Sequence, residues 1–203
     1  LFFVNHMDKE FADFDGVLQE IQDRYGKGAI SIQIPVNPGE GFNQIVDIFK
    51  MKLLAFPIDG SGKAEISDIP LELQEHAEII REQLIEAAAE SDDELTEKYL
   101  EHGELSEKEI HQGLKIGIRN RTLFPVLCGN VAGNIGVSLL LDFLVSGMPA
   151  PSEVELPEDP NADSQDVKKS AISPEGQPAA IVFKTISETV GDLSFLRVYS
   201  GSL

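Results

Sequence analysis

The sequence predicts an α/β fold, and three segments carry that prediction. Residues 1–4 and 123–127 are short apolar runs, typical of strands that are buried on both faces. Each run leads through a loop into a segment whose apolar residues recur at helical spacing. Residues 30–36 instead alternate Ile or Val with Ser, Gln and Pro, which indicates a half-buried strand whose end, at Pro35, lies at a sheet edge.

Apolar spacing and turn residues predict the other elements outside the most acidic part of the chain. Gly26 ends the first helix, because glycine is favoured just after the last helical residue. Glycine-containing turns at 38–41 and 59–62 enclose further strands. The expected elements are a helix over 9–25, one or two strands within 45–56, and a helix over 136–145.

Residues 65–109 form an acidic segment, with sixteen Asp or Glu residues against three Lys or Arg residues. Pro70 is well placed for the first turn of a long helix, whose apolar residues recur at steps of three and four. Two shorter helices are expected after it, each beginning at a capping box and separated by Gly103. The capping boxes are Ser91 with Glu94 and Ser106 with Glu109, and the apolar stripe is Leu73, Ala77, Ile80, Leu84 and Ala88.

The amino-acid composition changes in the last quarter of the chain. Residues 149–177 carry five prolines and few large apolar residues, which predicts a linker or long loop that is partly disordered. Strand-like segments at 181–183 and 193–199, with a Gly-Asp turn before the second, predict a hairpin. Because two strands alone are marginally stable, the hairpin is expected to begin a β domain that continues further. The chain is therefore expected to be a piece of a larger protein.

Composition limits the class of protein. With 203 residues, 42% hydrophobic content and no apolar run of bilayer length or signal peptide, we expect a cytoplasmic globular protein without membrane contact. The net charge of −19 argues against nucleic-acid binding, because phosphate contacts need clustered Lys and Arg. A single cysteine, Cys128, suits a reducing compartment and excludes an internal disulfide. His76, His102 and His111 lack metal-ligand spacing, so no metal site is predicted.

The first strand leads into Asn5, His6, Met7 and Asp8, the layout of the guanine-reading loop N-K-x-D of a GTPase with His in place of Lys. A carboxylate there accepts from N1–H and the exocyclic amine of guanine, a pair of donors that adenine lacks on that edge. An Asn followed three residues later by an Asp also occurs in ordinary turns that bind no ligand. The strand before it and the helix after it favour the binding interpretation, because ligands gather at strand carboxyl ends in α/β sheets.

A second loop strengthens this interpretation. Residues 124–137 place a strand before Cys128-Gly129-Asn130-Val131 and a helix after it, and they resemble the second guanine-contacting loop of translational GTPases, usually C-G-S-A followed by F-K-N-K-G-V. The whole chain resembles the elongation factor G family, the GTPases that drive translocation on the bacterial ribosome. The stretches that carry the resemblance are 3–8, 45–52, 84–90, 97–100, 125–137 and 195–201.

The resemblance implies a domain order as well as a site. Residues 1–150 would be the C-terminal part of a G domain of the P-loop GTPase type, with an inserted α+β subdomain at about 37–120. Residues 151–177 would be a linker, and 178–203 the start of a β-barrel second domain. GTP or GDP would bind through Asn5, His6, Met7, Asp8, Gly129, Asn130 and Val131, with Mg²⁺ held by upstream segments. The ribosome would be the partner, with its stalk protein on Glu75, Glu78, Glu82, Glu86 and Glu90.

No phosphate-binding loop G-x-x-x-x-G-K-[ST] occurs in the sequence, since Gly62-Lys63 is followed by Ala64. In the family that loop precedes the matched region. The full-length parent is therefore expected to hydrolyse GTP, whereas this chain alone is not, and no catalytic residue is predicted in it. His6 and Asn130 depart from the family motifs and keep two alternatives open: a non-hydrolysing ribosome-binding paralogue and a ribosome-protection protein. The acidic helix equally fits an ordinary solvated face.

Overall fold

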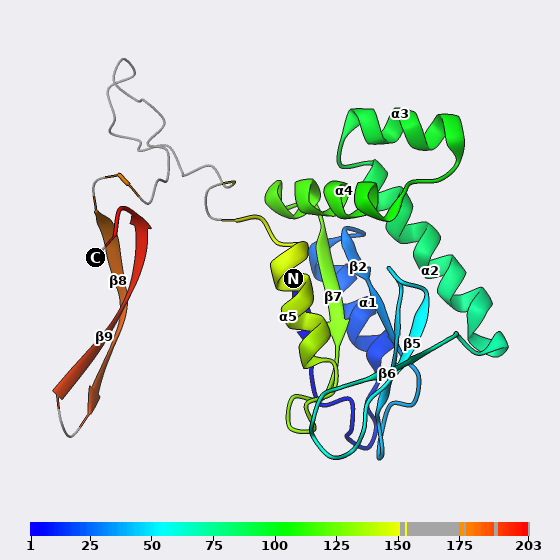
Figure 1. The fold of residues 1–203 in the computed structure, drawn as a ribbon, viewed down its shortest axis with the longest axis horizontal. Coiled ribbons are helices and arrows are strands. Elements are labelled where there is room, and N and C mark those ends of the chain that lie inside the picture. The colour runs from blue at the N-terminus through cyan, green and yellow to red at the C-terminus, as the bar shows by residue number, and fades with distance from the viewer. Residues whose placement is uncertain (151–152, 154–174, 177, 189–190, 203) are drawn as a thin grey trace. The chain divides into compact units, whose positions relative to one another are not determined.

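Figure 1 shows the fold in a computed structural model, which describes residues 1–150, 153, 175–176, 178–188 and 191–202. The chain forms two compact units, Leu1–Met148 and Pro149–Leu203. The first unit is a mixed α/β structure with a parallel and an antiparallel sheet. Its elements are β1 (Phe2–Val4), α1 (Phe14–Tyr25), β2 (Ala29–Ser31), β3 (Gln33–Pro35), β4 (Gln44–Asp47), β5 (Lys52–Ala55), β6 (Glu65–Ser67), α2 (Leu71–Ala89), α3 (Asp93–His102), α4 (Glu107–Arg119), β7 (Phe124–Cys128) and α5 (Val137–Ser146).

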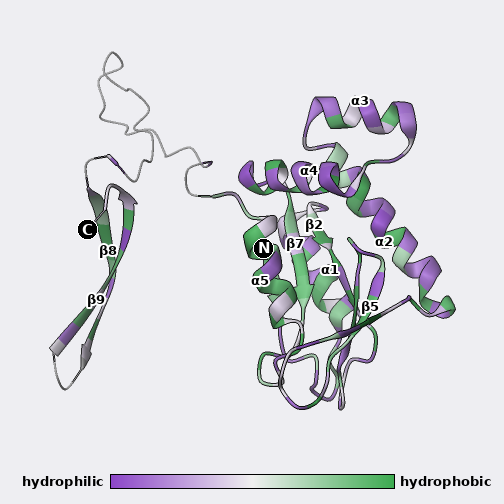
Figure 2. Ribbon diagram, viewed as in Figure 1, coloured by the Kyte–Doolittle hydropathy of each residue, from purple (hydrophilic) through white to green (hydrophobic). Residues whose placement is uncertain are grey.

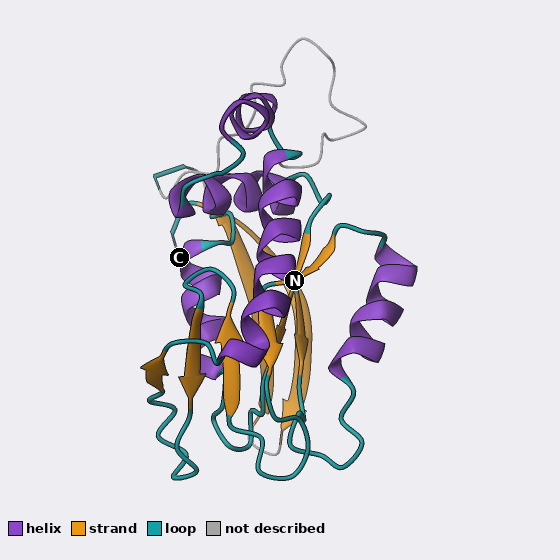
Figure 3. Cartoon of the chain, turned by 90° about the vertical axis from the view of Figure 1, so that its right-hand side faces the viewer, coloured by secondary structure: helices purple, strands orange, loops and turns teal. Residues whose placement is uncertain are grey.

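The parallel sheet has the order β1-β7-β2, so β7 is its central strand. Val126 of β7 belongs to an apolar cluster with Leu18 and Ile21 of α1, and Leu127 to a second cluster with Phe143 of α5. Figure 3 shows helices on both sides of the strands, and Figure 2 shows β7 and α5 as mostly hydrophobic. Burial on both faces explains why this strand is apolar throughout, and the predicted α/β class is confirmed.

The antiparallel sheet has the order β3-β4-β5-β6 and lies between β2 and β7 in the sequence. Ile45 and Leu54 of this sheet belong to the cluster that contains Val126, whereas Val46 shares a cluster with Leu84 of α2 and Leu114 of α4. Helices α2 and α4 approach closely at Gly113, where an added Cβ would lie 2.2 Å from the carbonyl oxygen of Ala88. The predicted stripe of α2 is confirmed, because all five of its residues are buried or half-buried in this cluster.

Two predicted elements near the N-terminus were wrong in their bounds. Helix α1 begins at Phe14 rather than residue 9, because Asp13 accepts from Gly16 N at 2.9 Å as the N-cap and Phe11 has a left-handed φ of 64°. Residues 30–36 do not form one strand: the chain passes from β2 in the parallel sheet to β3 in the antiparallel sheet. Both Ser31 and Gln33 are buried, so the half-buried pattern was also wrong.

Of the two predicted capping boxes, the one at Ser106 is confirmed and the one at Ser91 was wrong. Ser106 Oγ accepts from Glu109 N, and Glu109 Oε2 accepts from Ser106 N, as predicted. In contrast, α3 is capped by Asp92, whose carboxylate accepts from the first-turn N–H groups. The Ser91 hydroxyl donates instead to Ala87 O, 3.1 Å away in the preceding helix. A serine this close to a helix end satisfies the last carbonyls of α2 rather than the first amides of α3.

The second unit contains an antiparallel hairpin of β8 (Ala179–Glu188) and β9 (Gly191–Ser200), which confirms the predicted pairing. Several of its large side chains are exposed, including Phe183 and Phe195. Most of the predicted linker at 151–177 lies outside the described residues. Among the helices that the structure describes, none is both long and apolar enough to cross a membrane.

Candidate functional site

The two loops identified in the sequence leave the same edge of the parallel sheet. Strands β1 and β7 are neighbours and run parallel, with Val4 opposite Cys128. The first loop therefore begins at Asn5 beside the start of the second loop at Gly129. This is the carboxyl edge of the sheet, where α/β proteins place their ligand sites.

The first loop is held against the second by both backbone and side chain. Asn5 Oδ1 accepts from Val131 N at 3.0 Å, and Met7 N donates to Gly129 O at 3.2 Å. Met7 is buried, whereas Asn5 and His6 are exposed and His6 has a left-handed φ of 63°. The buried Met7 anchors the loop, and its carbonyl oxygen accepts from Gly39 N at 2.7 Å. Asn5 and His6 are thus exposed to solvent, while the backbone hydrogen bonds of Met7 hold the loop in place.

Asp8 has an incompletely satisfied carboxylate. Its Oδ1 is buried without a hydrogen-bond partner among the described residues, and its Oδ2 lies 3.4 Å from Lys9 Nζ. The side chain as a whole is 26% exposed. A buried acceptor without a donor is unfavourable, and a ligand that brings two N–H donors would satisfy it. The carboxylate therefore fits the donor pair of guanine in chemical type.

The second loop closes on itself through Asn130. Its backbone exchanges hydrogen bonds with Ile135 at 2.9 and 3.0 Å, and its Oδ1 accepts from Gly133 N at 3.3 Å. Asn130 is only 7% exposed, so its side chain shapes the loop, while Val131 is 53% exposed. Gly129 is required sterically, because a Cβ there would lie 2.5 Å from Ile135 O. Val131 and Ala132 are thus the exposed residues at the tip of this loop.

The structure also shows two contacts to the second loop that the sequence did not predict. Cys128 N donates to Gln33 Oε1 at 2.9 Å, and Asn134 Nδ2 donates to Gly60 O at 3.0 Å. Both partners come from the antiparallel sheet or its turns. The only sequence signal was a glutamine placed among apolar strand residues, and the alternation there suggested a solvent-facing position.

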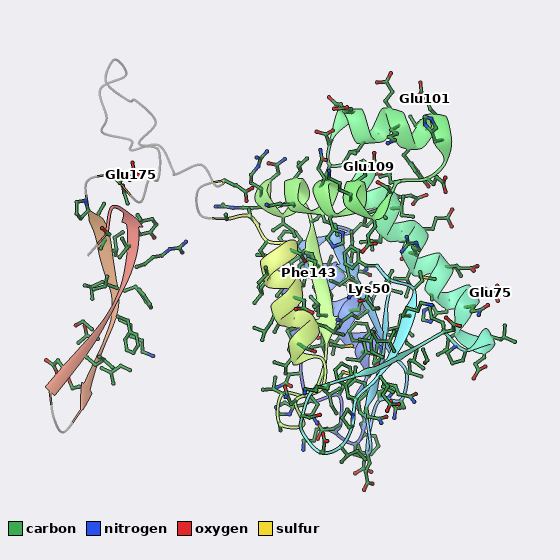
Figure 4. All side chains as sticks on the ribbon, viewed as in Figure 1. Lys50, Glu75, Glu101, Glu109, Phe143 and Glu175 are labelled. Atoms are coloured by element: carbon green, nitrogen blue, oxygen red, sulfur yellow. The ribbon has the colours of Figure 1, made fainter. Side chains whose placement is uncertain are left out.

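The acidic face of α2 is exposed as the sequence pattern indicates. Figure 4 shows Glu75 projecting from the outer end of this helix. Two of its carboxylates, Glu86 and Glu90, also line an open groove of about 650 Å³ between α1, β2 and α2. Desolvation raises the pKa of Tyr99 on α3, and the charges of Glu86 and Glu82 raise it further. The exposed residues are Glu75, Glu78, Glu82, Glu86 and Glu90.

A smaller cavity of about 80 Å³ lies between the antiparallel sheet, α4 and α5. Gln33, Asp47 and Phe143 contribute to its walls, together with His111, which stacks on Phe49 at a ring distance of 4.5 Å. Burial raises the pKa of Asp47, although hydrogen bonds from the N–H groups of residues 49 and 50 oppose that shift. Phe143 and Lys50, which also line this cavity, are labelled in Figure 4. The cavity is too small for a nucleotide.

The described residues of these loops offer neither a metal-binding cluster nor a reactive thiol. Across the part of the chain that the structure describes, no group of three His, Cys, Asp or Glu residues could hold a metal ion. Cys128 is fully buried, and that burial raises the pKa of its thiol well above the ordinary value. A buried thiol of this kind is a packing residue.

No family model matches the chain. The chain is similar to a protein from Thermus thermophilus whose crystal structure is known, with a TM-score of 0.77 and 26% sequence identity. The match covers 98% of this chain and 27% of that protein. The similarity therefore extends over nearly all of this mixed α/β chain and its hairpin, and the chain spans about a quarter of the length of the protein it matches.

Proposed function

We propose that this chain is the guanine-reading part of a translational GTPase related to elongation factor G. The observation that carries the proposal is the junction of two loops at one sheet edge, joined by the bond from Val131 N to Asn5 Oδ1. Beside that junction Asp8 holds a buried oxygen without a donor among the described residues. An acceptor pair at the carboxyl edge of a parallel sheet is suited to the Watson–Crick edge of guanine.

Each loop residue has its own role in the proposed site. Asp8 accepts from N1–H and the exocyclic amine, and Asn5 holds the loops together. The His6 ring stacks on the base in place of the Lys stem, and the backbone around Gly129, Asn130 and Val131 faces the base from the other side. Mg²⁺ and the phosphates would be held by segments upstream of the matched region, so the 203-residue chain alone hydrolyses no GTP.

Calorimetric titration of the full-length protein with GDP and with ADP tests the proposal. GDP should bind at least about tenfold more tightly, because adenine leaves the Asp8 carboxylate without its two donors. Equal affinities would overturn guanine recognition. Turnover of GTP by the purified 203-residue chain above the buffer rate would overturn the second part of the proposal.

A second proposed function is docking of the ribosomal stalk protein on the acidic face of α2. Five exposed carboxylates on one helix repel one another by a few tenths of a kcal/mol per pair, and a basic partner would relieve that repulsion. Reversal of Glu82 and Glu86 to Lys should weaken stalk binding at low salt. Reversal of Glu101 and Glu104, exposed carboxylates near α3, is the matched control for net charge. Equal loss in both pairs would contradict a specific site on α2.

The departures from the family motifs keep two alternatives open. His6 lacks the long stem and fixed charge of Lys, and Asn130 replaces a small hydroxyl residue. A paralogue that binds the ribosome without hydrolysis, or a ribosome-protection protein, would carry such changes. Stalk-dependent GTP hydrolysis by the full-length protein tests the first of these: its absence with intact ribosome binding supports the non-hydrolysing paralogue, and its presence contradicts it.

A further inference from the structure

The side chain of Gln33 joins the antiparallel sheet to the strand end that carries the second loop. Its Oε1 accepts from Cys128 N at 2.9 Å, although the two residues are 95 positions apart. Gln33 is 3% exposed, and Cys128 is fully buried. Since a backbone N–H can only donate, the amide oxygen rather than the nitrogen must face Cys128. The bond is therefore a buried, oriented contact between the two sheets.

The hydrogen bond from Cys128 N to Gln33 Oε1 takes the place of a backbone hydrogen bond to the neighbouring strand. The pairing of β2 with β7 ends at Ser31 opposite Val126, two residues before Cys128. The chain then turns away into β3: Ile32 N still donates to Val126 O at 3.1 Å, but Ile32 O accepts from Ile48 N at 3.2 Å and so is not the acceptor of Cys128 N. The Gln33 amide oxygen supplies the acceptor that a longer β2 would have supplied. Without it, the N–H of Cys128 would be buried and unpaired, which costs more than the loss of an exposed hydrogen bond.

The contact is one of several that hold the second loop at its ends. Directly after Cys128, Gly129 N donates to Val4 O at 3.0 Å on the β1 side. The loop is thus fixed on one side by the strand of the first loop and on the other by Gln33. At its far end, Asn134 donates to Gly60 O in the turn between β5 and β6. The antiparallel sheet therefore sets where the loop begins and where it ends.

We propose that Gln33 is a positioning residue for the guanine site, acting through Cys128 to set the backbone of the second loop against the base. The role rests on the proposed guanine recognition, but the geometry of the loop can be measured without any nucleotide. Gln33 does not touch the base itself. It positions the N–H and C=O groups of residues 129–131 because it accepts from Cys128 N, the backbone donor directly before them.

The test uses the full-length protein with three single variants. Gln33→Met keeps the shape of the side chain and removes the acceptor, whereas Gln33→Glu keeps an oxygen at the same place. Gln22→Met is the matched control, because Gln22 Nε2 also bonds a strand backbone, Ala29 O at 2.9 Å, without reaching the loop. Hydrogen exchange of the amides of residues 128–135 is measured without ligand, and GDP and ADP affinities are measured separately.

Gln33→Met should speed exchange over residues 128–135 about tenfold and weaken GDP binding about tenfold, the size expected for one buried hydrogen bond. ADP binding should not change, and Gln33→Glu, whose buried carboxyl group can still accept from Cys128 N when protonated, should exchange more slowly over residues 128–135 than Gln33→Met. Unchanged exchange in Gln33→Met, or equal effects in Gln22→Met, would overturn the positioning role. If the wild-type protein does not distinguish GDP from ADP, the guanine proposal fails, while the exchange result still decides whether Gln33 positions the loop.

A measurement on the wild-type chain covers the case in which Gln33→Met does not fold. A scalar coupling across the hydrogen bond, between the amide nitrogen of Cys128 and the side-chain carbonyl carbon of Gln33, can be recorded by NMR on deuterated 203-residue protein. Its detection supports the bond directly. Its absence, while the coupling from Gly129 N to the Val4 carbonyl is seen, would overturn the proposal.

Discussion

Asn5 Oδ1 accepts a hydrogen bond from the backbone N–H of Val131 at 3.0 Å, joining two loops that are 126 residues apart in the sequence. The two loops otherwise meet through backbone contacts, such as the one between Met7 N and Gly129 O. Asn5 is therefore the side chain that fixes the spacing between the first loop, which carries the proposed base-reading residue Asp8, and the second loop. Its own atoms need not touch the ligand to matter for affinity.

Replacement of Asn5 by Ala should weaken GDP binding about three- to tenfold, because one partly exposed hydrogen bond is worth about 1 kcal/mol. The melting temperature should change little, since Asn5 is exposed and belongs to neither apolar core cluster. Titration calorimetry on the full-length protein measures the first effect. Asn120→Ala, an exposed asparagine after α4, is the control. A Val131 amide that exchanges equally slowly in wild type and Asn5→Ala would contradict the bridging role.

Replacement of Asp8 by Asn should change which base is bound. Guanine offers two donors on this edge, whereas xanthine offers one donor at N1 and one acceptor at C2, which matches an amide. The Asp8→Asn protein would therefore lose affinity for GDP and gain affinity for xanthosine diphosphate, with a combined change of about a hundredfold in their ratio. Competition between the two nucleotides on the full-length variant measures this ratio. A ratio equal to that of the wild type would show that Asp8 does not contact the base.

Local signals in the sequence predicted much of this fold. The strands at β1 and β7, the apolar stripe of α2, and the capping box at Ser106 and Glu109 each depend on residues a few positions apart. Each of these was found where the pattern placed it, within a few residues, although β1 is half-buried and not buried on both faces as predicted. The paired loops also followed from their flanking strands and helices, because parallel neighbours bring their carboxyl ends together.

The remaining features depend on pairing between distant segments. The break between β2 and β3 occurs because each half pairs with a different sheet, and nothing in the run from Ile30 to Val36 signals two partners. Gln33 is buried for the same reason, since its acceptor is used by a strand end 95 residues later. The Asn130 side chain shapes its own loop through Gly133 N, a contact that the family motif did not suggest.

Replacement of Gly113 by Ala should destabilise the first unit, although Ala usually favours a helix by about 1 kcal/mol over Gly. A Cβ at this position would lie 2.2 Å from Ala88 O, so α2 and α4 would have to separate. Overpacking against a backbone atom costs about 1–3 kcal/mol and outweighs the gain in helix propensity. Chemical denaturation of the 203-residue chain measures the difference. Gln112→Ala, exposed on the same helix, should stay within about 0.5 kcal/mol of wild type.

Glu109 should make the stability of α3 and α4 depend on pH in the acid range. The side chains of Lys98 and Ser106, followed by the Ser106 backbone N–H, hold the pKa of Glu109 at about 2, below its ordinary value of 4.5. Because the folded pKa is the lower one, the stabilisation is complete above about pH 4.5 and is lost as the pH falls toward 2.

Glu109→Gln removes this titration, so the melting temperature should fall less steeply between about pH 5 and about pH 2 than in the wild type. Lys98→Met should reproduce part of that flattening, because it removes the first cause of the lowered pKa while the Ser106 contacts remain. Melting temperatures recorded for the three proteins in half-unit steps of pH measure both effects. Parallel curves for wild type and Glu109→Gln would show that neither Lys98 nor Ser106 lowers the pKa of Glu109 in solution.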